Sequence, residues 1–176
     1  GDYRHRFNVP ADWQDRRVFI VFGGVMTDAA VKVNGTEAGP PHQGSFYQFK
    51  HDITKLLRFG QENLLEVSVT DRSADASVNT AERKADYWVF GGIFRPVWLQ
   101  AEPKQFIDHV AIDAKADGAF ALDYFLDGVG GADSVSVTLL DAKNKPVGET
   151  TTVPVAAGRI ATNVSQPALW SSESPV

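Results

Sequence analysis

Short segments rich in β-forming residues, each followed by turn residues, run through nearly the whole 176-residue chain. Residues 17–22 include a continuous apolar run that is too short for a typical helix, and Gly23 and Gly24 end it. The apolar residues at 65, 67 and 69 alternate with polar residues, which is the period of a strand with one buried face. Helical periodicity is almost absent. The pattern predicts an all-β protein in which residues 17–22 form a central strand covered on both faces.

Several shorter signals divide the first hundred residues. Asn34-Gly35 suits a two-residue type I′ turn, because both central residues of that turn need a positive φ. Asn34 also begins an Asn-x-Thr glycosylation pattern, for which the turn is the better explanation. Residues 45–49 predict an aromatic-rich strand, and residues 52–57 a helical turn. Residues 71–85 hold one sizeable apolar side chain, Val78, and predict a long loop that is either functional or disordered.

The character of the sequence changes after Leu99, and Glu102-Pro103 marks a boundary. Shorter strands are expected beyond it, around residues 110–112, 120–125 and 135–139. The apolar residues at 135, 137 and 139 alternate with their neighbours and predict a face turned toward a core. Strands and turns at this spacing suggest an immunoglobulin-like sandwich. We therefore expect two β-sandwich domains, residues 1–103 and residues 104–176.

Charge and composition exclude several classes of function. The formal net charge is −5 and no run of Lys or Arg is present, which argues against nucleic acid or an anionic membrane surface as a partner. No segment approaches the ~18 apolar residues that span a bilayer. The absence of cysteine excludes disulfides, thiolate catalysis and Cys-ligated zinc. The four histidines are scattered, so the sequence predicts no metal site.

Residues 86–99 carry five large aromatic side chains and a glycine pair, directly after the polar segment. Aromatic rings beside a carboxylate suit a sugar, because its C–H faces stack on rings and its hydroxyls need charged or amide partners. The alternative is that most of these aromatic side chains fill the core of a sandwich and that Gly91-Gly92 makes a bulge or bend. The segment therefore indicates a sugar site only together with polar residues around it.

Asp86 is the best candidate for such a polar residue. It closes the polar segment where the chain turns into the aromatic one, so its carboxylate would be held by packing against the rings that follow. There it can accept hydrogen bonds from sugar hydroxyls or help to bind a hard cation through oxygen. The residues expected to share this substrate-binding pocket are Asp86, Trp88, Tyr87, Glu82, Arg83 and Asn79.

The sequence predicts no catalytic residues. No serine-nucleophile elbow, zinc-protease helix motif or phosphate-binding loop occurs. Glycoside hydrolysis needs two carboxylates held on a rigid frame, and the acidic residues at 71, 75, 82 and 86 lie in or beside the polar segment, which is a poor frame. Arg95 is expected either in a buried ion pair or bound to backbone.

Four blocks of sequence, in order, resemble the N-terminal sugar-binding domain of glycoside hydrolase family 2, the family of β-galactosidases, β-glucuronidases and β-mannosidases. The blocks are Val-Lys-Val-Asn-Gly at 31–35, Asp-Ile-Thr at 52–54, Asn-Leu-Leu at 63–65, and Asp-Tyr-Trp with Gly-Gly-Ile-Phe-Arg-Pro-Val at 86–97. Together they cover nearly all of residues 1–103. Residues 104–176 resemble the second, immunoglobulin-like domain of that family, cut just before its last strand.

The resemblance implies a jelly-roll (galactose-binding-like) β-sandwich followed by an immunoglobulin-like β-sandwich. It implies the non-catalytic N-terminal part of a retaining β-glycosidase resembling β-galactosidase, whose catalytic glutamates lie on a TIM barrel of the same polypeptide that this chain lacks. The chain would then be inactive alone, and would contribute a wall of the site for a β-galactoside or related β-glycoside. The resemblance implies no cofactor in this chain, although a sodium or other hard cation would lie near Asp86 in the full enzyme. It also favours an extracytoplasmic location.

Two other functions stay open. A stand-alone carbohydrate-binding module would bind sugar without any further domain and would lose that binding in Trp88→Ala. An adhesion or scaffolding protein with no affinity for sugar would tolerate Asp86→Ala.

Overall fold

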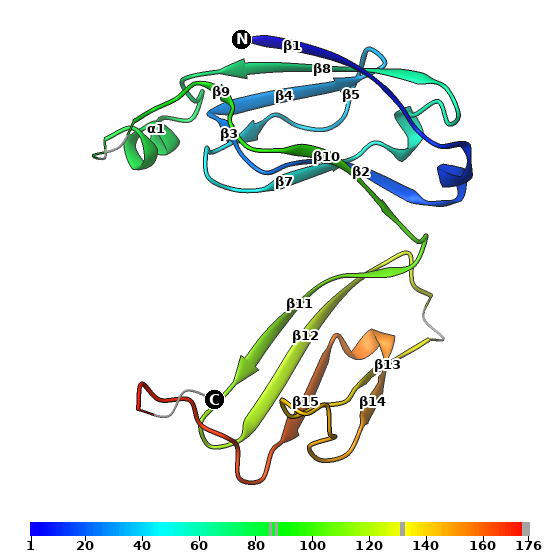
Figure 1. The fold of residues 1–176 in the computed structure, drawn as a ribbon, viewed down its shortest axis with the longest axis vertical. Coiled ribbons are helices and arrows are strands. Elements are labelled where there is room, and N and C mark those ends of the chain that lie inside the picture. The colour runs from blue at the N-terminus through cyan, green and yellow to red at the C-terminus, as the bar shows by residue number, and fades with distance from the viewer. Residues whose placement is uncertain (85, 87, 131–132, 174–176) are drawn as a thin grey trace. The chain divides into compact units, whose positions relative to one another are not determined.

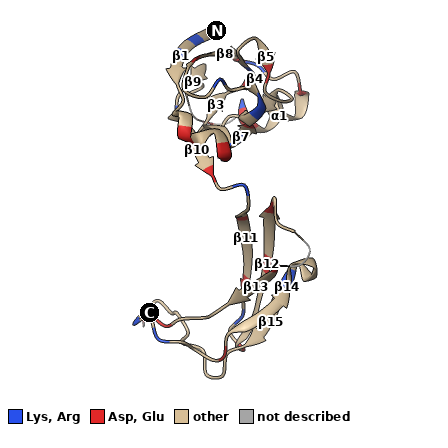
Figure 2. Cartoon of the chain, turned by 90° about the vertical axis from the view of Figure 1, so that its right-hand side faces the viewer, with Lys and Arg blue, Asp and Glu red and all other residues tan. Residues whose placement is uncertain are grey.

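The computed structural model describes residues 1–84, 86, 88–130 and 133–173. Contacts between Cα atoms divide the chain into two compact units, Gly1–Pro103 and Lys104–Val176, and strands dominate both (Figure 1). Acidic and basic residues are distributed over both units (Figure 2). No helix in the described part of the chain has the length and apolar character that a membrane crossing requires. The predicted all-β class is confirmed.

The unit Gly1–Pro103 is built from two main antiparallel sheets. One has the strand order β1-β8-β4-β5, with β6 also paired to β4, and the other has the order β10-β2-β7. A short antiparallel pair of strands, β3 with β9, lies near α1 (Figure 1). The strands are β1 (Asp2–Asn8), β2 (Arg17–Phe22), β3 (Val25–Met26), β4 (Asp28–Val33), β5 (Thr36–Glu37), β6 (His42–Gln43), β7 (Phe49–Asp52), β8 (Glu62–Thr70), β9 (Gly92–Ile93) and β10 (Val97–Glu102), with 3₁₀ turns at Ala11–Asp15 and Thr54–Leu56.

The core of this unit is formed by side chains of β2, β4 and β8. The five apolar residues of β2 are only 0–6% exposed, and β2 lies between β10 and β7, so the prediction of a central strand is confirmed. In β8, buried and more exposed residues alternate as predicted. The core residues are Val18, Ile20, Phe22, Val25, Ala29, Val31, Val33, Ile53, Leu65, Val67 and Val69.

The predicted turn at Asn34-Gly35 is confirmed. The φ angles are 53° at Asn34 and 81° at Gly35, and Val33 pairs with Thr36 across a two-residue loop. The side-chain nitrogen of Asn34, Nδ2, donates to the carbonyl of Leu56 and to Asn63 Oδ1, both at 2.8 Å. Both amide hydrogens are therefore used inside the fold, which supports the turn over glycosylation. The predicted helical turn is the 3₁₀ turn at Thr54–Leu56.

The unit Lys104–Val176 has one sheet in the order β11-β12-β15 and a pair β13-β14, again antiparallel. Its core cluster is formed by the buried residues Leu122, Tyr124 and Ile160, and Val135 and Val137 pack against them as predicted. Leu139, predicted on the same face, lies after the end of β13. The elements are β11 (Phe106–Ala114), β12 (Ala119–Asp127), β13 (Ser134–Val137), β14 (Thr151–Pro154), a 3₁₀ turn at Val155–Ala157 and β15 (Arg159–Asn163).

The prediction of a long loop at 71–85 is wrong for residues 76–82, which form the helix α1 (Ala76–Glu82). Asp75 caps it: one carboxylate oxygen accepts a hydrogen bond from the Ser77 amide at 2.7 Å. The Asn79 side chain accepts from the Ser73 amide at 3.0 Å and donates to the Ser73 carbonyl at 2.8 Å. Polar side chains thus hold α1 in place, and none of its residues is buried. A search for apolar periodicity cannot detect such a helix.

Candidate functional site

The first part of the aromatic segment, of which residues 86 and 88–91 are described, leads from α1 into β9 at one end of the unit Gly1–Pro103 (Figure 1). Its far end is fixed by the pairing of β9 with β3, in which Ile93 lies opposite Val25 and Gly92 opposite Met26. Gly92 has φ +95°, a conformation that favours glycine. The glycine pair therefore bends the chain where the aromatic segment joins the sandwich.

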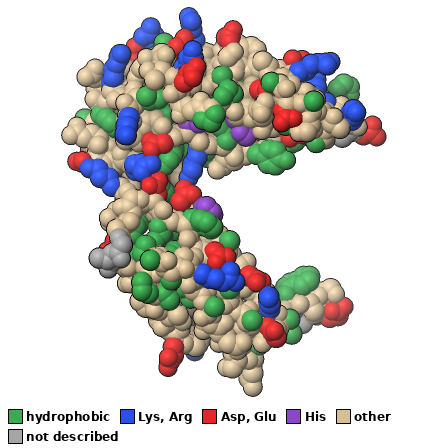
Figure 3. All heavy atoms as spheres, turned by 180° about the vertical axis from the view of Figure 1, so that it is seen from behind, with side chains coloured by type: hydrophobic (Ala, Val, Ile, Leu, Met, Phe, Trp, Pro, Cys, Tyr) green, Lys and Arg blue, Asp and Glu red, His purple; other side chains and the backbone are tan. Residues whose placement is uncertain are grey.

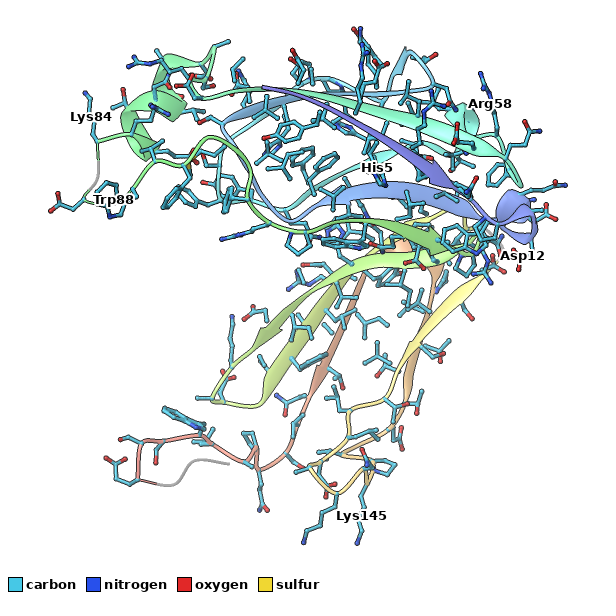
Figure 4. All side chains as sticks on the ribbon, turned by 45° about the horizontal axis from the view of Figure 1, so that its top comes forward. His5, Asp12, Arg58, Lys84, Trp88 and Lys145 are labelled. Carbon is cyan, nitrogen blue, oxygen red and sulfur yellow. The ribbon has the colours of Figure 1, made fainter. Side chains whose placement is uncertain are left out.

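Most aromatic side chains of the segment point to solvent. Trp88 is 83% exposed, Phe90 65%, Phe94 40% and Trp98 39%, so the alternative that they fill the core is wrong for these four. Figure 4 shows the labelled Trp88 standing clear of the sheets, and Figure 3 shows hydrophobic side chains at the surface of the end that carries α1. Tyr87 lies outside the described residues. Exposed aromatic surface of this kind marks a site of interaction.

Asp86 is exposed, like Trp88 two residues further along the chain. Its carboxylate is therefore accessible from solvent. Its packing against the rings that follow stays a prediction, because Tyr87 lies outside the described residues. We call the exposed side chains of Asp86, Trp88, Phe90 and Phe94 the aromatic surface.

The other candidates, Asn79, Glu82 and Arg83, use their polar groups to hold the elements next to the aromatic surface. Glu82 Oε2 accepts a hydrogen bond from the Ser45 amide at 2.8 Å, and the Arg83 guanidinium donates to the carbonyl of Asp71. The side-chain amide of Asn79 is hydrogen-bonded to the backbone of Ser73, as described above. Their direct contact with sugar stays a prediction.

Arg95 connects three segments of the same end. One guanidinium nitrogen donates to the carbonyls of Gly23 and Phe46, both at 3.2 Å, and the guanidinium carbon lies 5.2 Å from the centre of the Phe94 ring. Arg95 is exposed, so of the two roles expected for it the bond to backbone is the one observed. Its contacts bring residues 44–48 beside the aromatic segment.

Residues 44–48 belong to this end of the unit and were missed as part of the site. The sequence predicted a strand at 45–49, but β7 begins only at Phe49 and the preceding residues form a loop. In this loop Phe46 is 40% exposed and Tyr47 63% exposed. The adjacent aromatic residues Phe46 and Tyr47 are the sequence signal that could have identified this loop. In a strand, however, alternation would turn one of the two side chains inward, so the pair was assigned to a strand.

His42 and Phe49, which flank this loop in the sequence, belong to a stack of rings. The ring centres of His42 and Phe49 are 3.9 Å apart and nearly parallel, and His51 meets the Phe49 ring edge-on at 5.6 Å. Burial lowers the pKa of both histidines below the usual 6.5. For His42 the carbonyl of Gly44, Asp28 and Glu82 partly offset this effect, and for His51 the neighbouring His42 adds to it.

These pKa shifts predict a pH-dependent stability. Because both histidines are held neutral in the fold, their contribution is fully present above pH 6.5 and is lost as the pH falls through that value toward the lowered pKa. Urea denaturation at several pH values from about 7.5 down to 5.5 should show that the free energy of unfolding decreases as the pH decreases. The double variant His42→Asn/His51→Asn should flatten this dependence, whereas His5→Asn, at an exposed position, should keep it. An unchanged slope in the double variant would contradict the assignment.

Among residues 1–84, 86, 88–130 and 133–173, no group of three or more His, Cys, Asp and Glu side chains is placed to hold a metal ion. Hard cations take six or more oxygen ligands, and Asp86 offers one carboxylate. The remaining ligands of the cation expected near Asp86 would have to come from elsewhere.

A separate cleft of about 480 Å³ opens between β1 and β10. Most of the residues that line it are apolar, among them Phe7, Phe22 and Val97, and the polar side chains of Arg4 and His5 line it too. A sugar needs hydrogen-bonding groups for its hydroxyls as well as apolar faces. The exposed carboxylate of Asp86 provides such a group on the aromatic surface, which stays the predicted sugar site.

The comparisons with known proteins agree with this architecture. A sequence profile of the family described as "Glycosyl hydrolases family 2, sugar binding domain" matches residues 1–103. A β-galactosidase of Thermoanaerobacter pseudethanolicus is 39% identical over 99 residues, which are 56% of this chain and 13% of that protein. A β-galactosidase of Priestia megaterium is 31% identical over 191 aligned positions, with 99% of this chain and 18% of that protein covered. The chain thus spans less than a fifth of the length of these two relatives.

A solved structure from Bacteroides fragilis, described as a candidate β-galactosidase, superposes on 99% of this chain with a TM-score of 0.80 and 26% sequence identity. This chain covers 28% of that structure. The profile match over more than half of the chain, the relative that aligns with nearly all of it and the shared architecture lead to one assignment. The chain belongs to glycoside hydrolase family 2 and contains its sugar-binding domain.

Proposed function

We propose that this chain is the N-terminal, non-catalytic part of a retaining β-glycosidase resembling β-galactosidase, and that its aromatic surface forms one wall of the sugar site. In this proposal residues 1–103 are a jelly-roll sugar-binding domain and residues 104–176 an immunoglobulin-like domain. The two catalytic carboxylates belong to a TIM barrel of the same polypeptide. The observation that carries the proposal is the exposure of Asp86 and of the Trp88 ring, two residues further along the chain.

The chemistry of this surface supports the proposal. A pyranose presents apolar C–H faces and polar hydroxyls together, so it needs a ring for one and a hydrogen-bond acceptor for the other. Trp88 provides the ring, and the Asp86 carboxylate provides an acceptor whose hydrogen bonds are strengthened by its charge. The surface is open on one side, as expected of a wall that needs a second half. The substrate class we propose is a β-galactoside or related β-glycoside.

A substitution at Asp86 tests the proposal in the enzyme that contains this chain. Asp86→Asn removes the charge but keeps the shape, and should lower kcat/KM for a β-galactoside by about 10- to 100-fold, since a hydrogen bond to a charged group contributes about 1.5–3 kcal/mol. Glu149→Gln, at an exposed position in the other unit, makes the same chemical change and should leave kcat/KM unaltered. Equal kinetics for the two variants would refute the role of Asp86. A gene that encodes no βα units after Val176 would refute the glycosidase.

A second candidate function is a stand-alone carbohydrate-binding module. The observation in its favour is that Trp88, at 83% exposure, is already accessible in this chain. A module predicts that the 176-residue chain binds sugar tightly by itself, whereas a wall of a larger site predicts weak binding, because a half-site recovers little of the cost of association. Isothermal titration of the chain with galactose, glucuronate and mannose separates the two.

A further inference from the structure

The aromatic surface lies on a stretch of chain whose two ends reach the same place in the fold. Before it, the carboxylate of Glu82 at the end of α1 accepts a hydrogen bond from the amide of Ser45 at 2.8 Å. After it, the guanidinium of Arg95 donates to the carbonyl of Phe46 at 3.2 Å. Ser45 and Phe46 are consecutive residues, so both ends are bound to one short piece of backbone.

The attachment at Glu82 belongs to a network with buried members. Ser45 is 2% exposed and Thr27 1% exposed. The Ser45 hydroxyl donates to the Thr27 hydroxyl at 3.4 Å, and the Thr27 hydroxyl donates to the carbonyl of Asp71 at 3.3 Å. The guanidinium of Arg83 donates to the same carbonyl. Two consecutive residues, Glu82 and Arg83, are therefore bound to groups that this buried network holds in place.

The attachment at Arg95 is supported by close packing on the buried Gly24. The same guanidinium also donates to the carbonyl of Gly23 at 3.2 Å. A methyl group built on Gly24 would lie 2.9 Å from Arg95 Cδ and 3.0 Å from the tip of the Phe94 ring. It would also lie 3.3 Å from the carbonyl oxygen of Ser45. The side chains of residues 94 and 95 therefore pack against Gly24 at a place that loop 44–48 also reaches.

The charge of each attaching side chain suits the backbone group that it binds. The carboxylate of Glu82 accepts from an N–H group, and the guanidinium of Arg95 donates to carbonyl oxygens. Hydrogen bonds of this kind, in which one partner is ionised, are roughly twice as strong as those between neutral groups. Asp86 and Trp88 lie between the two attachments in the sequence. The length of the chain limits how far they can move while both ends are fixed.

We propose that Glu82 and Arg95 are positioning residues for the sugar wall, which hold both ends of the chain that carries Asp86 and Trp88 against the backbone of loop 44–48. The proposal rests on the function proposed above, because it gives these residues a role in a wall that binds sugar. It assigns Glu82 to the support of the wall and not to direct contact with the sugar. A wall that is fixed before the sugar arrives loses less entropy on binding, so the two attachments should act on substrate affinity.

Kinetics of the enzyme that contains this chain are the first part of the test. Glu82→Ala removes the acceptor, and Arg95→Met removes the donors but keeps the apolar stem. Each should raise KM for a β-galactoside about fivefold to tenfold and leave kcat within about twofold, because binding is lost equally in the ground state and the transition state. Glu82→Gln keeps an oxygen that can accept from the Ser45 amide, and should restore most of the affinity. Arg58→Met, at an exposed position far from Trp88 in Figure 4, is the control and should keep KM unchanged.

Nuclear magnetic resonance of the ¹⁵N-labelled chain without sugar separates positioning from direct contact. Hydrogen exchange at the Ser45 amide should become at least about tenfold faster in Glu82→Ala, because that amide loses its acceptor. The ¹H–¹⁵N nuclear Overhauser effect at the Trp88 amide, which falls when a backbone becomes more mobile, should decrease in Glu82→Ala and in Arg95→Met. A residue that only contacts sugar would leave both measurements unchanged.

The possible failures are distinguishable, and because the two variants break separate attachments, either one that folds decides. If the Trp88 amide behaves as in the unaltered chain, the attachments do not position it and the proposal is wrong. If that amide becomes more mobile while KM stays the same and Asp86→Asn still lowers kcat/KM, positioning does not matter for binding. The proposal is then wrong and the proposed function stands. If Asp86→Asn also leaves kcat/KM unaltered, the sugar wall is wrong and this proposal fails with it.

Discussion

Phe22→Ala is expected to lower the free energy of unfolding of the unit Gly1–Pro103 by about 3–5 kcal/mol, the usual cost of removing a phenyl ring from a close-packed core. Phe22 is completely buried in β2, and its ring stacks on Phe49 with centres 4.8 Å apart and an angle of 5° between planes. Phe49 in turn stacks on His42. The cavity would therefore open directly beside the stacked rings of Phe49 and His42.

Urea denaturation followed by circular dichroism measures this loss. Phe90→Ala makes the same chemical change at a side chain that is 65% exposed, and should alter the free energy of unfolding by no more than about 0.5 kcal/mol. A loss of similar size in both variants would contradict the assignment of Phe22 to the core and of Phe90 to the surface.

The strands could be predicted from the sequence because their signals are local. The apolar run in β2 and the alternation in β8 each report burial through a period of two, and Asn34-Gly35 reports a turn through the φ angles it tolerates. Helix α1 could not be predicted in this way. It has no buried face, and its stability comes from the Asp75 cap and from polar bonds to segments that are adjacent only in the folded chain.

The candidate site could be predicted only in part, for a similar reason. Asp86 and Trp88 stand out because a carboxylate and rings lie close together in the sequence. The bond from the Ser45 amide to Glu82 and the two bonds from Arg95 to backbone join residues 37 to 72 positions apart, which no local pattern reveals. Loop 44–48 was missed because its aromatic residues also satisfy the pattern of a strand.

Asn63→Ala is expected to lower the free energy of unfolding by about 3–4 kcal/mol, nearly as much as the loss of a core ring, because it leaves several buried polar groups without partners. Asn63 is 1% exposed. Its Oδ1 accepts from Asn34 Nδ2 and from the Arg58 amide, both at 2.8 Å, and its Nδ2 donates to the carbonyls of Arg58 and Gln61, both at 3.0 Å. One side chain therefore joins the hairpin turn of β4 to the loop before β8.

The variant Asn63→Asp separates the two halves of this network. Aspartate keeps the oxygen that accepts from Asn34 and Arg58 but loses both donated bonds and buries a charge, so it too should be destabilising by more than about 2 kcal/mol. Asn8→Ala, at an exposed position on β1, is the matched control and should stay within about 0.5 kcal/mol of the unaltered chain in urea denaturation. A value for Asn63→Ala as small as that of Asn8→Ala would contradict the network. Because β4 and β8 are adjacent strands in the sheet that leads to α1, loosening Asn63 should lower stability without changing which sugar the aromatic surface binds.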